Sequence, residues 1–180
     1  MSQKNKIIYT IGHSTRPIDQ FIAILKIYGI EEILDVRTIP KSRYNPQFNK
    51  KSLSEALKKN NIKYHQVELL GGLRHAKKDS ENMGWRNASF RGYADYMQTP
   101  DFSKGLDELE KIAAKQTVAI MCAEVVPWRC HRSLIADALT RQKIKVIHVL
   151  DIKHSYVHKI TPFLKFKAGK IYYPKVDNDK

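Results

Sequence analysis

The sequence predicts a single α/β domain with a mostly parallel five-stranded sheet and helices on both of its faces. Short β-rich apolar runs alternate along the chain with segments of helical apolar spacing, which is the order of βαβ units. The chain has 180 residues, of which 42% are hydrophobic, and this suits one domain with one core. We expect residues 1–151 to form the α/β domain and residues 152–180 to form a basic C-terminal extension of the same domain.

The first three elements form a βαβ unit. Residues 7–12 are a short apolar run that ends in glycine, which predicts a buried strand. Pro17 suits the first turn of a helix, apolar residues then follow helical spacing, and Gly29 suits the helix end. Residues 32–36 predict the second strand. Because the connections are short, the two strands are expected to be parallel, with a right-handed crossover.

A loop, a short helix and a third strand are predicted next. Residues 38–49 are rich in proline, serine, asparagine and arginine, as loops are. Ser52 and Glu55 have the spacing of a capping box that opens a short helix through Lys59. Residues 62–70 predict the third strand, which a pair of glycines closes.

The rest of the chain contains a long polar segment and an ambiguous tail. Residues 73–88 are longer than most loops and are a candidate functional lid. Residues 163–173 alternate weakly and predict either a β-hairpin around Ala168 and Gly169 or a mobile basic tail. The elements between them are helices near residues 90–98 and 102–115, a strand at 117–122, a helix at 129–141 and a fifth strand at 144–150.

The chain is strongly basic, with a formal net charge of +14. Residues 41–63 contain seven basic residues and one acidic residue, and residues 153–180 contain seven lysines and two aspartates. Such charge favours nucleic acid or another anionic partner. The alternative is a lysine-rich solvated surface, because the lysines are scattered along the helices rather than gathered in one run.

Two features of the composition bear on where the protein works. No apolar run approaches the ~18 residues that a membrane helix needs, and the first residues lack the apolar region of a secretory signal. The two cysteines, Cys122 and Cys130, are too few for a disulfide scaffold. We therefore expect a cytoplasmic protein with no membrane partner.

Three polar clusters follow predicted strands. His13 and Ser14 come directly after the first strand, and Asp35 and Arg37 end the second. Residues 122–132 leave the fourth strand and are rich in cysteine, histidine, arginine and glutamate. In open α/β sheets, ligands bind beyond the carboxyl ends of the strands. We therefore expect the three clusters to converge on one pocket at this edge of the sheet.

The residue types in these clusters suggest two kinds of role. Imidazole, carboxylate and thiol groups suit proton transfer or nucleophilic attack, whereas guanidinium and hydroxyl groups suit anion binding. His13 could instead be a loop histidine bonded to the backbone, and Asp35 and Arg37 could form a purely structural ion pair. The candidate catalytic residues are His13, Asp35, Glu124 and Cys130, and the candidate anion-binding residues are Ser14, Arg37, Arg43 and Arg132.

The segment from Cys122 to Arg132 allows three chemistries. Cys130 could be a nucleophile, because a nearby helix N-terminus and basic neighbours lower the pKa of a thiol. The two cysteines with Glu124 and His131 could bind zinc or iron, although their spacing is not that of a standard finger. Alternatively, Cys122 is a small buried residue, and Arg132 and helix amides hold an anion. We assign no metal ligand and no cofactor, and we expect Cys130 to react with thiol probes faster than Cys122.

Five motifs also support a family resemblance. They are TIGHS at residues 10–14, DVR at 35–37 with Pro40, Ser42 and Arg43, LGG at 70–72, FRGY at 90–93, and CAE at 122–124 with Pro127 and CHR at 130–132. On these motifs the chain resembles the family catalogued as domain of unknown function 488, over roughly residues 7–151. The resemblance implies a compact bacterial or archaeal cytoplasmic α/β protein in which the polar clusters form a shared site. It implies no activity.

Two classes of function follow from these observations. The first, which we favour, is an enzyme or ligand-binding protein that acts on a phosphorylated or nucleotide-like anion, with arginines holding the anion and acidic or imidazole groups moving protons. The second is a nucleic-acid-binding module that uses the basic surface, and the two combine if the substrate is nucleic acid. The aromatic residues available for base stacking are Tyr44, Phe48, Tyr172 and Tyr173.

Overall fold

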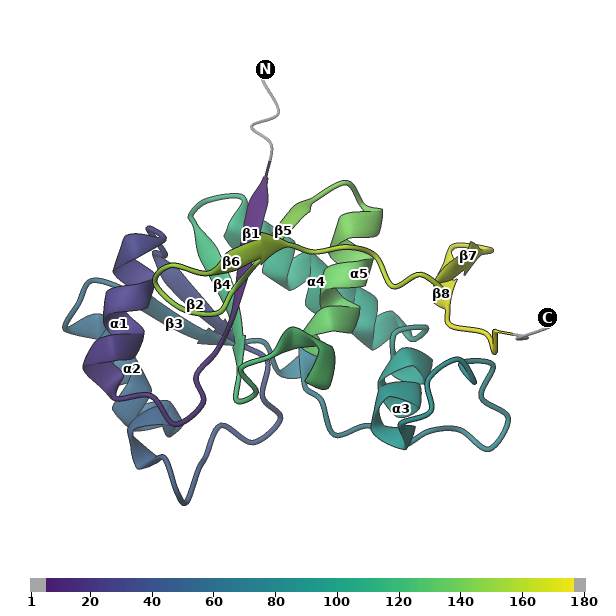
Figure 1. Ribbon diagram of the computed structural model, residues 1–180, viewed down its shortest axis with the longest axis horizontal. Coiled ribbons are helices and arrows are strands. Elements are labelled where there is room, and N and C mark those ends of the chain that lie inside the picture. The colour runs from purple at the N-terminus through teal and green to yellow at the C-terminus, as the bar shows by residue number, and fades with distance from the viewer. Residues whose placement is uncertain (1–5, 177–180) are drawn as a thin grey trace.

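A computed structural model describes residues 6–176, which form a six-stranded sheet, five α-helices and a separate two-stranded hairpin (Figure 1). No helix in these residues is long and apolar enough to cross a membrane. The sheet strands are β1 (Ile7–Gly12), β2 (Glu32–Asp35), β3 (Lys63–Gln66), β4 (Val118–Cys122), β5 (Lys145–Val149) and β6 (Ser155–Val157), and the hairpin strands are β7 (Lys165–Lys167) and β8 (Lys170–Tyr172). The α-helices are α1 (Ile18–Ile27), α2 (Lys50–Lys58), α3 (Ala88–Tyr96), α4 (Pro100–Ala113) and α5 (Arg132–Arg141).

The sheet confirms the predicted α/β class and adds one strand. The strand order is β3-β2-β4-β1-β5-β6. Strands β1 to β5 pair in parallel, and β6 pairs antiparallel to β5. The sequence did not predict β6, because this strand has three residues, all exposed, and therefore has no buried face to create an alternating pattern. The order places β2, β4 and β1 side by side, so their carboxyl ends are neighbours.

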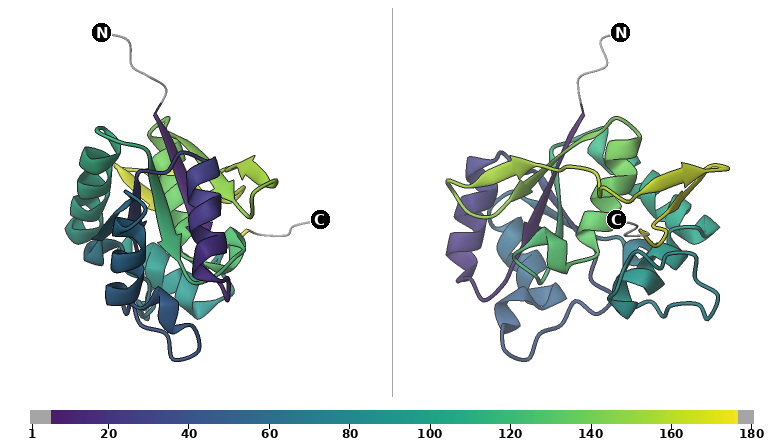
Figure 2. Two further views of the ribbon diagram at one scale, coloured as in Figure 1. Left: turned by 90° about the vertical axis from the view of Figure 1, so that its left-hand side faces the viewer. Right: turned by 45° about the vertical axis from the view of Figure 1, so that its right-hand side comes forward.

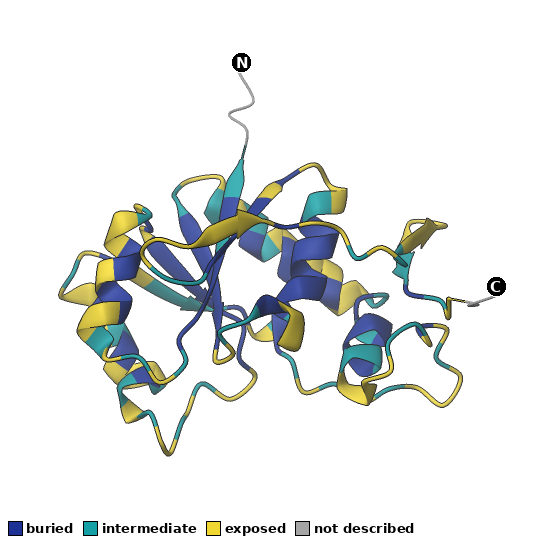
Figure 3. Cartoon of the chain, in the orientation of Figure 1, coloured by how far each residue is buried: buried dark blue, intermediate teal, exposed yellow. Residues whose placement is uncertain are grey.

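Helices cover the two faces of the sheet and enclose two cores (Figure 2). Helices α1 and α2 contribute apolar residues such as Leu25 and Leu57 to one core. Helices α3, α4 and α5 contribute to the other. Helix α5 is the most enclosed, with residues 132–139 all buried (Figure 3). Because Arg132 and Asp137 are among these residues, α5 brings two charged groups into the interior, and both need polar partners there.

Helix α2 begins differently from the prediction. Its N-cap is Asn49, so the capping box of Ser52 and Glu55 does not form. The side chain of Asn49 makes no cap hydrogen bond either. Its carboxamide oxygen accepts a hydrogen bond from the backbone N–H of Ser42 at 2.6 Å, so Asn49 fastens the preceding loop instead of the helix.

Two other elements are shorter than predicted. Helix α5 begins at Arg132 because Pro127–Arg129 form a separate 3-10 turn, η3. Strand β3 ends at Gln66, and Glu68–Leu70 form another 3-10 turn, η2. Both differences leave irregular backbone at the carboxyl edge of the sheet, where side chains can point in directions that a regular element would not allow.

The segment predicted as a lid, residues 73–88, has no helix or strand before α3 begins. Its middle is fastened to the buried Asp95 of α3. The Asp95 carboxylate accepts hydrogen bonds from the Lys77 N–H, the Ser80 hydroxyl and the Asn82 amide, all at 2.7–2.8 Å. These contacts hold the middle of the segment against α3.

The C-terminal hairpin predicted around Ala168 and Gly169 is confirmed. Strands β7 and β8 pair antiparallel, and both turn residues have positive φ. The chain that follows is docked through the buried Tyr173. Its hydroxyl donates to Asp137 of α5 at 2.8 Å, and its N–H donates to the Asn82 carboxamide at 2.9 Å. The tail is therefore packed against the domain at this point.

Candidate functional site

A pocket of about 1060 Å³ opens at the carboxyl edge of the sheet. Its walls come from the residues that follow β1, β2 and β4, from the chain after η2 and from the first turns of α3. The described lining residues include one acidic side chain, Glu124, and four permanent cations, Arg37, Lys41, Arg74 and Arg129. This balance of charge makes the pocket suitable for an anion.

Close backbone packing joins the ends of β1 and β4. The N–H of His13 donates to the carbonyl of Cys122 at 2.9 Å, so the parallel pairing continues past both strands. A side chain at Gly12 would strike the backbone of Glu124, and only glycine therefore fits at this crossing. The next turn has φ of 51° at Ser14, a conformation that costs energy in a residue other than glycine. Such strain at a pocket wall is typical of functional sites.

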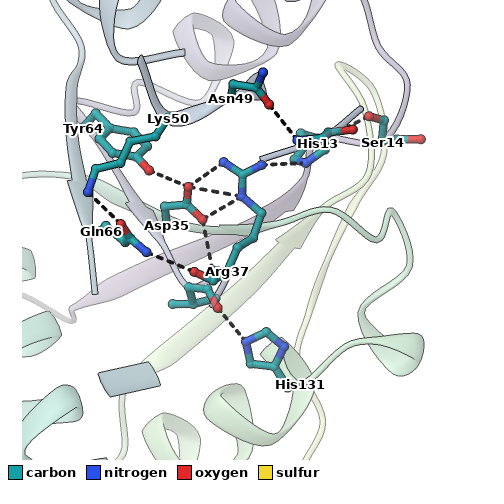
Figure 4. Close-up of polar contacts among 11 residues, drawn as sticks. His13, Ser14, Asp35, Arg37, Asn49, Lys50, Tyr64, Gln66 and His131 are labelled. Atoms are coloured by element: carbon teal, nitrogen blue, oxygen red, sulfur yellow. Dashed lines mark hydrogen bonds and ion pairs between the residues drawn. The ribbon is translucent and has the colours of Figure 1, made fainter. Parts of the chain in front are cut away.

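Asp35, Arg37 and His13 form a buried chain of hydrogen bonds (Figure 4). Arg37 donates to the Asp35 carboxylate from Nε at 2.9 Å and from Nη2 at 2.6 Å. Its Nη1 lies 3.2 Å from Nε2 of His13, and Nδ1 of that ring lies 2.8 Å from the Ser14 carbonyl oxygen. Because arginine only donates and a carbonyl only accepts, these partners fix His13 as the neutral tautomer with its hydrogen on Nδ1.

Asp35 supports Arg37. Its carboxylate also accepts the hydroxyl of Tyr64 at 2.6 Å and the N–H of Arg37 at 3.0 Å, so its lone pairs are all engaged (Figure 4). A carboxylate in this state is poorly placed to accept a proton from a ligand. Burial acts to lower the pKa of Arg37, but the hydrogen bonds and charge of Asp35 outweigh it and raise that pKa. Arg37 therefore stays cationic on the pocket wall.

His13 is held in place by its neighbours. Burial lowers the pKa of His13 to about 4, so the ring is neutral near pH 7. The ring stacks on Phe48 with a centroid distance of 4.3 Å. Because both ring nitrogens already have partners, the geometry favours a binding and packing role for His13 over proton transfer.

Cys130 and His131 form a cysteine–histidine pair on the pocket wall. The Sγ of Cys130 lies 3.6 Å from Nδ1 of His131, and the N–H of Arg132 donates to the same sulfur at 3.4 Å. Nε2 of His131 donates to the Val36 carbonyl at 3.0 Å, which leaves Nδ1 without a hydrogen on the side facing the sulfur. A thiol, a base and a group that orients the base are the parts of an activated nucleophile.

The pKa values of the two thiols are shifted in opposite directions. Burial raises the pKa of Cys122 well above its usual range. Burial also acts to raise the pKa of Cys130, but a hydrogen bond from Cys122 and the positive charge of Arg132 overcome this effect and bring that pKa to about 6. At neutral pH, Cys130 is therefore expected to be the thiolate and Cys122 the thiol that donates to it.

The guanidinium of Arg132 lies behind the two cysteines. Its Nε donates to the Sγ of Cys122 at 3.0 Å, and its Nη1 donates to the hydroxyl of Thr10 at 3.0 Å. Its Nη2 donates to the carbonyl oxygens of Glu124 and Val125. Arg132 thus ties the loop after β4 to the sheet and holds positive charge beside the sulfurs.

Arg132 is one end of a buried polar relay, which runs Arg132–Thr10–His148–His158–Asp137. The Thr10 hydroxyl lies 2.7 Å from Nδ1 of His148, Nε2 of His148 lies 2.8 Å from Nδ1 of His158, and Nε2 of His158 lies 2.8 Å from Asp137. With an arginine donating at one end and a carboxylate accepting at the other, every link points in the same direction. Burial lowers the pKa of His148 to about 3, so this ring is neutral. The relay connects a buried cation to a buried anion and leaves neither isolated.

The structure brings most of the predicted site residues together. Arg132 is fully buried and engaged with protein groups, because its side chain turns beneath the loop after β4, so it does not offer a guanidinium to the pocket. Asp35 likewise lies behind the wall, and Arg43 is exposed and outside the lining. Within residues 6–176, no group of three or more His, Cys, Asp or Glu side chains could hold a metal ion. The predicted residues that line the pocket are His13, Ser14, Arg37, Glu124 and Cys130.

Several important groups had no clear signal in the sequence. The sequence suggests His131 only as a possible metal ligand or as a basic neighbour of Cys130, and adjacent side chains usually point in different directions. Here Cys130 is extended and His131 is helical, and this irregular step brings the ring beside the sulfur. Tyr64 lies on a strand without apolar alternation. His148 does have a signal in the sequence: a histidine inside the predicted buried strand 144–150 needs a polar partner, which indicates a buried hydrogen-bond network there.

The comparisons with known proteins identify a family. No curated protein and no solved structure matches the chain significantly. A family model described as domain of unknown function DUF488 matches residues 17–139, which is more than half of the chain. The matched range contains Arg37, Glu124, Cys130 and the start of α5, and it begins after His13 and Ser14. The chain belongs to the DUF488 family.

Proposed function

We propose that the pocket binds a phosphorylated, nucleotide-like anion and that Cys130 acts on this ligand as a nucleophile. One observation carries the proposal: a permanent cation, Arg37, and a thiol of lowered pKa, Cys130, line the same pocket at the carboxyl edge of the sheet. A cation can hold an anionic group while a thiolate attacks a nearby electrophilic atom. The protein is then an enzyme.

The donors of Arg37 support the anion-binding part. Its contacts with Asp35 and His13 leave, among the described residues, one N–H on each terminal nitrogen without a protein partner. Two such N–H groups on a fixed guanidinium match the spacing of two oxygens on a phosphate. Lys41 and Arg129 line the same pocket and add charge.

The walls of the pocket support a nucleotide-like ligand over a bare phosphate. Beside the cations, the lining includes the apolar side chains of Ile39, Leu73, Phe90 and Val126. A ligand with a flat apolar part and an anionic part would use both kinds of wall. The volume, about 1060 Å³, is large enough for such a ligand.

The cysteine–histidine pair supports a covalent step. In this step the Sγ of Cys130 forms a bond to an electrophilic atom of the ligand, and the leaving group departs with the electron pair of the bond that breaks. Because Cys130 is a thiolate at neutral pH, no thiol proton is passed on, and the leaving group takes up a proton from water. In molecules whose Cys130 is protonated, Nδ1 of His131, 3.6 Å from the sulfur, can accept the thiol proton before the attack.

Calorimetric titration with phosphate, ribose 5-phosphate and a nucleoside monophosphate tests the binding part. The nucleotide should bind most tightly. Arg37→Lys should weaken nucleotide binding by about 10-fold or more, because an ammonium cannot donate two parallel hydrogen bonds to a phosphate as a guanidinium does. Arg37→Ala should weaken binding further. Lys41→Gln should weaken it less, since Lys41 is an exposed point charge.

Lys145→Gln is the matched control. Lys145 is an exposed lysine that begins β5, at the opposite edge of the sheet from the pocket. Its removal changes net charge by the same amount as Lys41→Gln and should leave nucleotide affinity unchanged. Equal affinity of wild type, Arg37→Lys and Lys41→Gln for the nucleotide would reject the proposal, as would the absence of saturable binding to all three ligands.

A further inference from the structure

We propose that the natural ligand is a nucleotide within a single-stranded nucleic acid, and that the neighbouring nucleotides bind across the pocket mouth on a rim formed by residues 39–45 and 128–129. The inference rests on the proposed function and names the substrate class of the same pocket. Three features of the rim support it: its charge, its exposed aromatic side chains and the rigidity of its longer segment.

The charge of the rim matches a polyanion. Lys41 and Arg43 are exposed on one segment, and Arg129 is exposed on the other. Residues 37–51 contain five basic and no acidic residues. Arg43 does not line the pocket itself, but it lies in the chain between Ser42 and Asn45, which do, and we infer that it contacts a second phosphate of a longer ligand. Lysine and arginine side chains along such a path track a phosphate backbone.

Two aromatic side chains on the rim are unusually exposed. Tyr44 is 87% exposed, and it lies between Ser42 and Asn45, which both line the pocket. Trp128 is 61% exposed, and the adjacent Arg129 lines the pocket from another side. Exposed aromatic rings beside a basic groove are the stacking surfaces of proteins that bind single strands. In a duplex the bases are already stacked on each other, so the rings indicate a single strand.

The segment that carries Tyr44 is held in place. The Ser42 N–H donates to the Asn49 carboxamide at 2.6 Å, and the Asn45 N–H donates to the Ser42 hydroxyl at 3.0 Å. The Lys50 N–H closes the segment by donating to the carbonyl of Pro40 at 2.9 Å. A fixed turn presents the ring without an ordering cost on binding, which favours a defined contact over a solvated surface residue.

Fluorescence anisotropy with a labelled 10-nucleotide single DNA strand tests the inference, with the duplex of the same sequence and a nucleoside monophosphate as comparisons. The single strand should bind at least tenfold more tightly than the mononucleotide and more tightly than the duplex. Tyr44→Ala and Trp128→Ala should each weaken strand binding by about 5- to 100-fold and leave mononucleotide binding unchanged. Tyr44→Trp should retain it. Arg43→Gln should reduce the slope of log affinity against log salt by about 0.7.

Phe166→Ala is the matched control, because Phe166 is an exposed aromatic residue between two lysines on the C-terminal hairpin, away from the pocket lining. It should not alter strand binding. The inference is overturned if the duplex binds as tightly as the single strand, if Phe166→Ala weakens binding as much as Tyr44→Ala, or if neither rim variant has an effect. If the mononucleotide binds and the strand binds no better, this inference fails alone. If neither binds, the proposed function fails with it.

Discussion

Replacing Arg132 with methionine is expected to destabilise the protein by ~3 to 5 kcal/mol and to raise the pKa of Cys130 from about 6 toward the ordinary thiol value. The variant removes the charge that favours the thiolate. It also leaves the carbonyls of Glu124 and Val125 and the hydroxyl of Thr10 without their donor, and the buried Asp137 at the far end of the relay keeps its hydrogen bonds but loses the compensating buried cation. Breaking a buried network at one end costs more than the network contributed, because the remaining partners stay desolvated.

Urea unfolding gives the stability change, and the pH dependence of Cys130 alkylation gives the pKa. Arg132→Lys keeps the charge, so it provides a measurable variant if the methionine protein does not fold. Arg132→Lys should raise the Cys130 pKa less than Arg132→Met does, because lysine lacks the several planar N–H donors of the guanidinium but keeps a cation near the sulfurs. Arg129→Met is the control: Arg129 is exposed, and its loss should change stability by no more than about 0.5 kcal/mol. An unchanged alkylation profile in Arg132→Lys would contradict the assigned role.

Gly12→Ala is expected to destabilise the protein by about 3 kcal/mol or more and to disrupt the pocket. An added Cβ would lie 2.7 Å from the Cα of Val125 and closer still to the carbonyl of Glu124. Both obstacles are backbone atoms, so no side-chain rotation relieves the clash, and the loop after β4 must move. That loop accepts hydrogen bonds from Arg132, so the damage reaches the cysteines.

Gly29→Ala separates this steric effect from an ordinary glycine effect. Gly29 has φ of +63° and nothing within 4 Å of an added Cβ, so alanine there should cost only about 1 kcal/mol of backbone strain. Thermal and urea unfolding of both variants measures the difference. A Gly12→Ala protein as stable as Gly29→Ala would mean that the loop after β4 adapts easily, and the close crossing would then have no role in shaping the pocket.

Much of the fold was accessible from sequence because buried strands and amphipathic helices leave periodic patterns. The buried strands β1, β2, β4 and β5 have such patterns, whereas β6, with three exposed residues, has none. Loop geometry was less accessible. Ser52 and Glu55 have the spacing of a capping box, yet the N-cap of α2 is Asn49. The Asn49 side-chain oxygen bonds to the neighbouring loop and not to the helix end, and spacing alone does not distinguish these two partners.

The sequence predicts the location of the site, but it predicts the roles of the individual residues only in part. The rule that ligands bind at the carboxyl ends of parallel strands located the pocket, since β2, β4 and β1 are neighbours. The roles depend on where side chains point. Residue types alone suggested Asp35 as a proton carrier and Arg132 as an anion ligand, whereas contacts with Arg37 and with Thr10 give them supporting positions. Such contacts join residues far apart in sequence and leave no local pattern.

The most direct test of the account is the alkylation of the native protein by iodoacetamide, with site assignment by mass spectrometry, in the absence and presence of a nucleoside monophosphate. We expect Cys130 to be modified first, with a rate that rises as the pH passes through about 6, while Cys122 stays unmodified at pH 7. The nucleotide should slow this modification with a half-effective concentration equal to its calorimetric Kd. Modification of Cys122 first, an inflection near pH 9, or a rate that saturating nucleotide leaves unchanged would contradict a pocket in which an anion and the Cys130 thiolate meet.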